Sequence, residues 1–151
     1  MIKILFVCHG NICRSPMAEY VLADMAHRRG LSDRIAAQSA ATSYEEIGND
    51  IHRGTKGVLR AHGVPFEKRA ARRMTAQDYE TFDLLIGMDR ANLSNMRRIA
   101  GGDAQNKIHS LLSYAGLDRD IADPWYTDDY EATFRDVVLG CGALLDALFK
   151  A

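Results

Sequence analysis

A cysteine and an arginine stand at the two ends of a short loop near the N-terminus. The stretch "VCHGNICRSPMAEY" runs from Val7 to Tyr20, with Arg14 six positions after Cys8. An apolar run typical of a buried strand precedes the cysteine, and a helical pattern follows the arginine. Such a loop presents backbone N–H groups in one direction, and the helix dipole adds partial positive charge. The segment therefore predicts a cradle for an anion.

The side chains of this loop predict what the cradle does. The planar guanidinium of Arg14 can hold two oxygens of a phosphate or arsenate, while Cys8 lies beneath the same anion. A thiol beside a guanidinium and a helix N-terminus favours the thiolate, its nucleophilic form. Ser15 can donate a hydrogen bond to the sulfur, and Asn11 can bond across the backbone of the loop. We therefore expect a nucleophile inside an oxyanion site.

A second stretch, "IADPWYTDD", offers a proton donor for a leaving group. Asp123 is followed by Pro124, which stiffens the chain, and by Trp125 and Tyr126, which can form aromatic walls. An acid flanked by aromatic side chains suits an aryl phosphate. In the alternative interpretation, Asp123 is a turn residue that binds its own backbone, and Trp125 anchors the core.

Composition limits the remaining possibilities. The 151 residues are 47% hydrophobic and 26% charged, which suits one compact domain spanning residues 1–151. A formal net charge of -1 gives no global attraction to nucleic acid or to an anionic membrane. Cys8, Cys13 and Cys141 are too few for a disulfide framework, and the apolar start is too short for a signal peptide. We expect a cytoplasmic protein.

The histidines show no metal-ligand spacing, so we expect no metal and no cofactor. They are His9, His27, His52, His62 and His109.

The hydrophobic pattern alternates between strands and helices. Strands are predicted at 2–7, 34–41, 82–89 and 108–114. Helices are predicted over 16–29, 53–61, a short segment opened by a cap at Thr75, a segment capped by Asp89 that continues to 96, and 134–148. This alternation predicts a parallel sheet covered by helices on both faces. Ligands of such sheets bind beyond the carboxyl ends of the strands, where the first strand meets its loop.

The motifs resemble those of one family. "VCHGNICRSPMAEY" is similar to the phosphate-binding loop of the low-molecular-weight protein tyrosine phosphatases, and "DPWY" to their general-acid loop. The similarity also takes in "SAATS", "HGVP" and "TFDLLIGMD". The resemblance implies the fold class α/β, a single domain with a four-stranded parallel sheet in the order 2-1-3-4, flanked by helices on both faces.

The resemblance also implies a mechanism without metal. Cys8 would attack phosphorus, and Asp123 would protonate the departing phenol and then help water to hydrolyse the phosphocysteine. Cys13 matches a second loop cysteine that can form a disulfide with Cys8 and protect it from irreversible oxidation. The implied catalytic residues are Cys8, Arg14 and Asp123. The implied phosphate-binding residues are His9, Gly10, Asn11, Ile12, Cys13 and Ser15, with Trp125 and Tyr126 as the aromatic wall.

Three positions depart from the family pattern. The first residue after Asp-Pro is Trp125 rather than the commoner tyrosine, so regulation by phosphorylation of paired tyrosines has only the tyrosine that follows it to act on. Many members carry a histidine, hydrogen-bonded to the loop serine, near the position of Arg69, so the group that orients Ser15 is open. The side-wall position that is often tryptophan falls on Glu45 or Tyr44, which makes the pocket less apolar or open to basic peptides.

Three alternatives to a tyrosine phosphatase also use an anion-binding loop of this kind. A thioredoxin-coupled arsenate reductase of this fold needs two further mid-chain cysteines, and the sequence has none between Cys13 and Cys141. A protein-arginine phosphatase is marked by threonine in place of Ile12, whose methyls suit an aromatic ring. A non-catalytic phosphate-binding module would not need Cys8, Arg14 and Asp123 together. We expect phosphotyrosine-containing protein substrates, inhibition by phosphate and other oxyanions, and a monomer or weak dimer.

Overall fold

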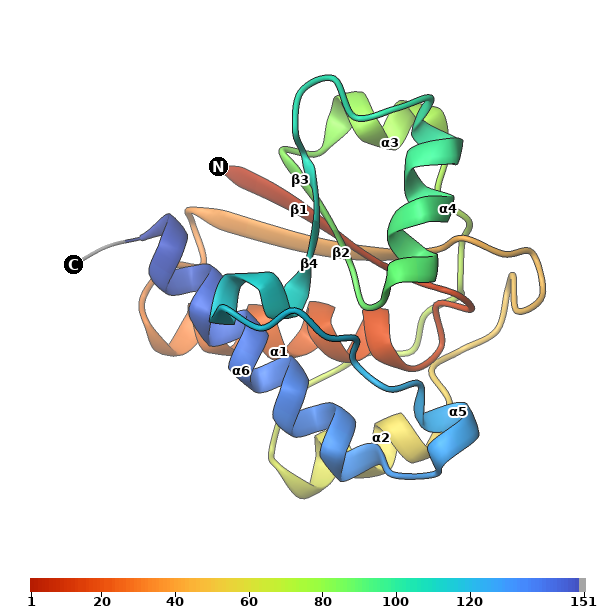
Figure 1. The fold of residues 1–151 in the computed structure, drawn as a ribbon. Coiled ribbons are helices and arrows are strands. Elements are labelled where there is room, and N and C mark those ends of the chain that lie inside the picture. The colour runs from red at the N-terminus through yellow and green to blue at the C-terminus, as the bar shows by residue number, and fades with distance from the viewer. Residues whose placement is uncertain (150–151) are drawn as a thin grey trace.

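A parallel sheet of four strands runs through the middle of the protein (Figure 1), in a computed structural model that describes residues 1–149. The strands are β1 (Ile2–Cys8), β2 (Ile35–Ala41), β3 (Leu84–Gly87) and β4 (Ile108–Ser110). Their order is β2-β1-β3-β4 and every pairing is parallel, which confirms the expected topology. Because β1 is central, its residues from Ile4 to Val7 are fully buried. A β-branched and aromatic run suits this position.

Helices cover both faces of the sheet (Figure 1). One face is covered by α1 (Arg14–Arg28) and α6 (Tyr130–Leu148), and the other by α3 (Ala76–Thr81) and α4 (Arg90–Ala100). The remaining helices, α2 (Arg53–Ala61) and the short α5 (Pro124–Thr127), lie near the start of α6. Alternate residues of β1 divide between two cores, since Ile4 and Phe6 pack toward α1 and α6 while Leu5 and Val7 pack toward α4.

The predicted fourth strand is too long. β4 ends at Ser110, and a 3-10 helix, η1 (Leu111–Ala115), follows it. Leu111 and Leu112 are consecutive, and both are buried in the core that contains α6. A strand would point them to opposite faces of the sheet, so the chain turns to bury both.

Helices α1, α5 and α6 also differ from prediction, and α6 starts at Tyr130, four residues before the predicted start. Helix α1 begins at Arg14, two residues before the predicted start at Pro16, so Arg14 lies in its first turn. Helix α5 was not predicted, because its four residues are too few to show a helical pattern. It starts with Pro124 at a position where the missing N–H costs nothing.

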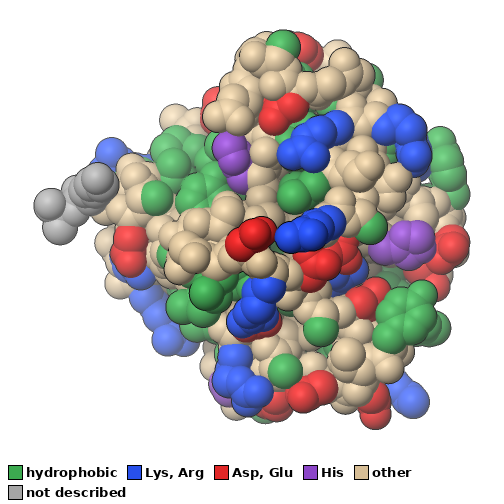
Figure 2. All heavy atoms as spheres, viewed as in Figure 1, with side chains coloured by type: hydrophobic (Ala, Val, Ile, Leu, Met, Phe, Trp, Pro, Cys, Tyr) green, Lys and Arg blue, Asp and Glu red, His purple; other side chains and the backbone are tan. Residues whose placement is uncertain are grey.

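The carboxyl ends of the strands gather the segments that carry the predicted site. The loop after β1, the loop after β2 and helix α5 lie at this end of the sheet (Figure 1). Positive and negative side chains are interspersed over the face shown in Figure 2, as the near-zero net charge leads one to expect. Within residues 1–149, none of the helices has the length and apolar character needed to cross a membrane.

Candidate active site

The sulfur of Cys8 lies at the focus of hydrogen-bond donors from its own loop. Sγ accepts from the backbone N–H groups of Asn11, at 3.3 Å, and Ser15, at 3.4 Å. The Ser15 hydroxyl lies 3.1 Å from the same sulfur. The loop therefore wraps around the thiol, as the sequence predicts, and these donors would stabilise negative charge on sulfur.

Asn11 holds the loop in this shape. Its backbone has φ of 59°, a left-handed conformation that asparagine tolerates, and its side chain is completely buried. The amide Nδ2 donates to Ser15 Oγ at 2.8 Å, and Oδ1 accepts from the backbone N–H of Arg72 at 3.2 Å. We expected the Asn11 side chain to bond to the backbone of its own loop. It bonds instead to the Ser15 side chain and to the backbone of Arg72, in a neighbouring segment.

The hydrogen bond from Asn11 Nδ2 also orients Ser15. Because Asn11 donates to Ser15 Oγ, the hydroxyl proton is free to point to Cys8 Sγ or to the carbonyl of Ala40, 3.4 Å away. Arg69 instead donates to Ser39 Oγ at 3.4 Å, one residue before Ala40 in β2. Ser39 in turn donates to Glu19. Arg69 therefore belongs to a charged contact beside the loop rather than to the serine.

Arg14 is almost fully buried, and its guanidinium is held by residues far away in the sequence. Nη1 donates to Asp89 Oδ2 at 2.7 Å and to the carbonyl of Ile121 at 2.9 Å. Burial alone would lower the pKa of Arg14, but the negative charges of Cys8 and the two aspartates raise it. Asp89 was predicted only as a helix cap. It does cap α4, since its Oδ1 accepts from Asn92 N–H, and its other oxygen orients Arg14.

Asp123 also lies beside Arg14, and it is a turn residue, as one of the two interpretations held. The other part of that interpretation is wrong, because Trp125 is largely exposed and does not anchor the core. Its Oδ1 accepts from Trp125 N–H at 3.0 Å and so caps α5, as a turn residue would. Its Oδ2 lies 3.4 Å from Arg14 Nη2, at the mouth of the loop. Local capping therefore places this carboxylate in the candidate site.

These groups surround one cavity of about 110 Å³ at the carboxyl end of β1. Most of the predicted site residues line it: Cys8, His9, Gly10, Ile12, Cys13, Arg14, Asp123, Trp125 and Tyr126. Asn11 and Ser15 lie beneath the loop with no exposed surface, so they support the cavity without lining it.

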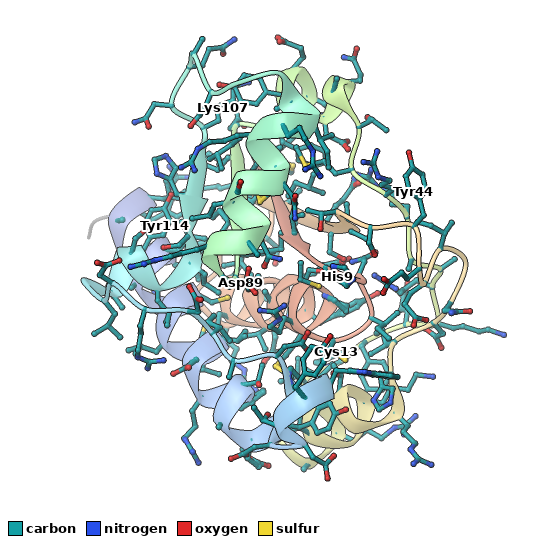
Figure 3. The ribbon with its side chains drawn as sticks, turned by 45° about the vertical axis from the view of Figure 1, so that its right-hand side comes forward. His9, Cys13, Tyr44, Asp89, Lys107 and Tyr114 are labelled. Carbon is teal, nitrogen blue, oxygen red and sulfur yellow. The ribbon has the colours of Figure 1, made fainter. Side chains whose placement is uncertain are left out.

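The rim combines aromatic and acidic side chains. Trp125 and Tyr126 are 55% and 84% exposed, so both are available to a ligand that enters the cavity. Glu45 and Glu46 from the loop after β2 line the same cavity. Of the two residues predicted for the side-wall position, Glu45 lines the cavity, whereas Tyr44 lies outside it (Figure 3). Glu46 was not predicted at the rim, because the shape of this loop, which the sequence pattern does not reveal, decides which of its side chains reach the cavity.

Cys13 differs from Cys8 in its surroundings, although both line the cavity. Burial, followed by the negative charge of Cys8, raises the pKa of the Cys13 thiol to about 12. At neutral pH Cys13 is thus a protonated thiol. Cys141 is completely buried in α6, where burial raises its pKa still further. Residues 1–149 contain no cluster of three potential metal-ligating side chains.

Comparison with known proteins gives one consistent family. The family model for low molecular weight phosphotyrosine protein phosphatase matches residues 3–151. The low molecular weight protein-tyrosine-phosphatase YfkJ of Bacillus subtilis is 42% identical over 99% of this chain and 97% of its own. Its crystal structure superposes with a TM-score of 0.94 at 41% identity, covering 98% of this chain and 94% of the other.

Two further solved structures show the breadth of the match. The low molecular weight protein tyrosine phosphatase SP-PTP from Streptococcus pyogenes has a TM-score of 0.89 at 38% identity, covering 99% of this chain and 95% of its own. A Drosophila arginine phosphatase has a TM-score of 0.88 at 30% identity, covering 99% of both chains. The chain belongs to the low molecular weight phosphotyrosine protein phosphatase family, which confirms the resemblance seen in its motifs.

Proposed function

We propose that this protein hydrolyses phosphotyrosine in proteins, and other aryl phosphates, through a phosphocysteine intermediate on Cys8. The observation that carries the proposal is the position of Cys8 Sγ, surrounded by N–H and O–H donors at the base of a cavity that Arg14 and Asp123 also line. A nucleophile, an oxyanion-binding group and a carboxyl group thus meet in one small space.

The guanidinium of Arg14 has donors left for a phosphate. A guanidinium carries five N–H groups. The two on Nη1 point to Asp89 and Ile121, and one on Nη2 points to Asp123. The Nε–H and the second Nη2–H can then hold two phosphate oxygens, while backbone N–H groups of the loop hold the third. The ion pairs fix the plane of the guanidinium before substrate arrives.

The reaction then follows in two displacements. The Cys8 thiolate attacks phosphorus, the bond from phosphorus to the phenolic oxygen breaks, and Asp123 gives its proton to that oxygen. Water next attacks the phosphocysteine, Asp123 takes a proton from the water, and the thiolate leaves with phosphate as the product. Inorganic phosphate fits the same cradle, so we infer that phosphate and other oxyanions inhibit the enzyme.

Features of the cavity favour an aryl ester over phosphoarginine. The branched methyls of Ile12 and the exposed faces of Trp125 and Tyr126 offer apolar contacts to a ring. A thioredoxin-coupled arsenate reductase would need a relay of accessible thiols beyond the loop, but Cys141 is completely buried. All three cysteines are free thiols, which supports an enzyme that works in a reducing compartment such as the cytoplasm. A monomeric or weakly dimeric state stays a prediction.

One comparison of substrates tests the proposal. Hydrolysis of a phosphotyrosine peptide is measured beside hydrolysis of free phosphoarginine and thioredoxin-dependent reduction of arsenate. We expect turnover of the phosphotyrosine peptide with a far higher kcat/KM than that of phosphoarginine, and no arsenate reduction. Preferred hydrolysis of phosphoarginine would overturn the proposal in favour of the arginine phosphatase. No turnover of any substrate would indicate a binding module.

A further inference from the structure

A second, wider groove of about 580 Å³ adjoins the catalytic cavity. It shares His9 and Glu45 with that cavity and continues along the loop after β2 toward α4. In Figure 3, Cys13, His9 and Tyr44 follow one another along the side of the molecule that faces the viewer. A peptide whose phosphotyrosine enters the cavity therefore has an open path into this groove.

The floor of the groove is tied to the phosphate-binding loop. Thr42 N–H donates to the carbonyl of Cys8 at 2.9 Å, and Ser43 N–H donates to that of His9 at 3.1 Å. Backbone hydrogen bonds of this kind keep the groove and the cavity in a fixed relation.

Arg73 is held in the groove in a defined orientation. Its Nε donates to the carbonyl of Thr42 at 3.2 Å, and its guanidinium lies 4.3 Å from the centre of the Tyr44 ring. Stacking of this kind suits arginine and leaves the terminal nitrogens at the edge of the ring available to an acceptor. Tyr44, 73% exposed, therefore has a role in holding Arg73.

The charges of the groove are not balanced internally. Arg73 and Arg98 both line it, and within residues 1–149 neither guanidinium forms an ion pair with a carboxylate. Arg72, the neighbour of Arg73, is by contrast bound to Asp78 through two contacts of 3.0 and 3.2 Å. The one carboxylate that lines the groove, Glu45, is paired with His9 at 3.0 Å.

We propose that this groove is a substrate subsite, in which Arg73 and Arg98 bind an acidic side chain close to the phosphotyrosine in the substrate sequence. The proposal rests on the proposed phosphotyrosine activity and adds to it the class of protein substrate. The preference for acidic neighbours comes from Arg73 and Arg98, which line the groove but, unlike the shared residues His9 and Glu45, lie outside the cavity that holds the phosphate. The groove thus favours an acidic residue on one side of the phosphotyrosine. The site therefore reads the direction of the peptide.

The test uses a set of otherwise neutral phosphotyrosine peptides. One Glu is moved through the positions on either side of the phosphotyrosine, and each peptide is paired with its Gln counterpart. We expect the Glu peptide to have a kcat/KM about two- to fivefold higher than its Gln partner at positions on one side only, the range for an exposed ion pair. This ratio should fall toward one as salt is raised.

Variants assign the effect to the groove. In Arg73→Gln and Arg98→Gln the ratio of Glu to Gln peptide should fall to about half of the wild-type value or less. Arg97→Gln is the matched control, because Arg97 neighbours Arg98 on α4 and is exposed but does not line the groove. The ratio of Glu to Gln peptide in Arg97→Gln should equal that of the wild type. Because Arg97→Gln changes the net charge as much as Arg98→Gln does, this result would show that net charge alone does not cause the preference.

Each result has a distinct meaning. Equal kcat/KM for Glu and Gln peptides at every position, or an equal fall of the ratio in Arg97→Gln and Arg98→Gln, would overturn the subsite while leaving the phosphatase activity intact. Absence of turnover for all phosphotyrosine peptides would overturn the proposed function, and the subsite with it.

Discussion

Arg14 Nη1 lies 2.7 Å from Asp89 Oδ2, and this ion pair joins the first helical turn after β1 to the start of α4, 75 residues later in the chain. The arginine side chain is 3% exposed and the aspartate side chain 20%. A buried guanidinium needs such a partner, because an unpaired buried charge is costly. We infer that Asp89 positions Arg14 for phosphate and also begins α4.

The first prediction separates these two roles of Asp89. In Asp89→Asn one amide oxygen cannot both cap α4 and accept from Arg14, so the guanidinium loses a charge-assisted bond. We expect kcat for a phosphotyrosine peptide to fall roughly ten- to a hundredfold, the value of one such hydrogen bond. Steady-state kinetics measures it, together with a weaker affinity for inorganic phosphate.

A matched variant controls for the lost cap. Asp129 caps α6 through a bond from Ala132 N–H and does not line the cavity. Asp129→Asn should leave kcat within about twofold of the wild type, since asparagine is an equally good cap. If Asp89→Asn keeps full activity and phosphate affinity, the positioning role of Asp89 is wrong.

The second prediction concerns the proton donor. Tyrosine leaves poorly as a phenolate, because its pKa is near 10, so Asp123→Ala should reduce turnover of phosphotyrosine by roughly 10² to 10⁴-fold. A nitrophenyl phosphate has a more acidic leaving group, so its turnover should fall much less in Asp123→Ala. General damage to the site would lower the turnover of both esters equally, so the difference between the two esters reports the loss of the proton donor.

Asp128→Asn is the control for Asp123. Asp128 lies in the same segment, at φ of 57°, which asparagine also tolerates, and it does not line the cavity. We expect this variant to treat both esters as the wild type does. An equal loss on both esters in Asp123→Ala would indicate that Asp123 acts only as the cap of α5, and the acid would then be sought at Asp128 or Asp129.

The third prediction concerns oxidation of the two loop cysteines. Mild peroxide should inactivate the enzyme reversibly by converting Cys8 to a sulfenic acid, which Cys13 then attacks to form a disulfide with loss of water. Burial, the larger cause that raises the pKa of Cys13, remains when Cys8 is a neutral sulfenic acid, so the small thiolate fraction of Cys13 still rises about tenfold for each pH unit near neutrality. Formation of the disulfide should therefore accelerate as the pH is raised from 7 to 9.

Mass spectrometry of the oxidised protein decides this role. Cys13→Ala should progress to irreversibly oxidised Cys8, whereas reductant should restore the wild type. Oxidised, inactive wild type without a Cys8–Cys13 disulfide would reject Cys13 as the resolving thiol.

The sequence predicts the part of the site that is built locally. Cys8, the loop and Arg14 follow one another within one strand–loop–helix unit, so apolar pattern and helix signals are enough to place them. The interpretation of Asp123 as a turn residue is also confirmed, since its carboxylate binds Trp125 N–H two residues on. In both cases short-range backbone geometry determines where the side chain lies.

Contacts between distant segments could not be predicted in the same way. Asp89 has a clear local signal as a helix cap, but only the pairing of β1 with β3 brings it to Arg14. The sequence did contain one indication that Asp89 belongs to the site. Asp89 closely follows β3 and so lies at the carboxyl end of the parallel sheet, where ligands bind. The end of β4 at Ser110 likewise depends on the packing of Leu111 against Gly140 of α6, where an added Cβ would lie 2.4 Å from Leu111 Cγ.

The fourth prediction concerns the nucleophile. Cys8→Ser should abolish aryl phosphatase activity while keeping phosphate affinity close to that of the wild type, because a hydroxyl is a far poorer nucleophile near neutral pH and the donors of the loop remain. Calorimetric titration with inorganic phosphate measures the binding. Cys141→Ala, a change in α6, should keep its activity, and substantial turnover by pure Cys8→Ser would exclude Cys8 as the nucleophile.

The phosphocysteine intermediate is tested most directly by trapping it. The wild type and Asp123→Ala are mixed with a phosphotyrosine peptide, quenched in denaturant within milliseconds, digested and mapped by mass spectrometry. We predict phosphate on Cys8 in both proteins, at a higher level in Asp123→Ala if hydrolysis of the intermediate is slowed more than its formation. Rapid turnover with unmodified Cys8 at every quench time, or with phosphate on another residue of the loop, would contradict the mechanism.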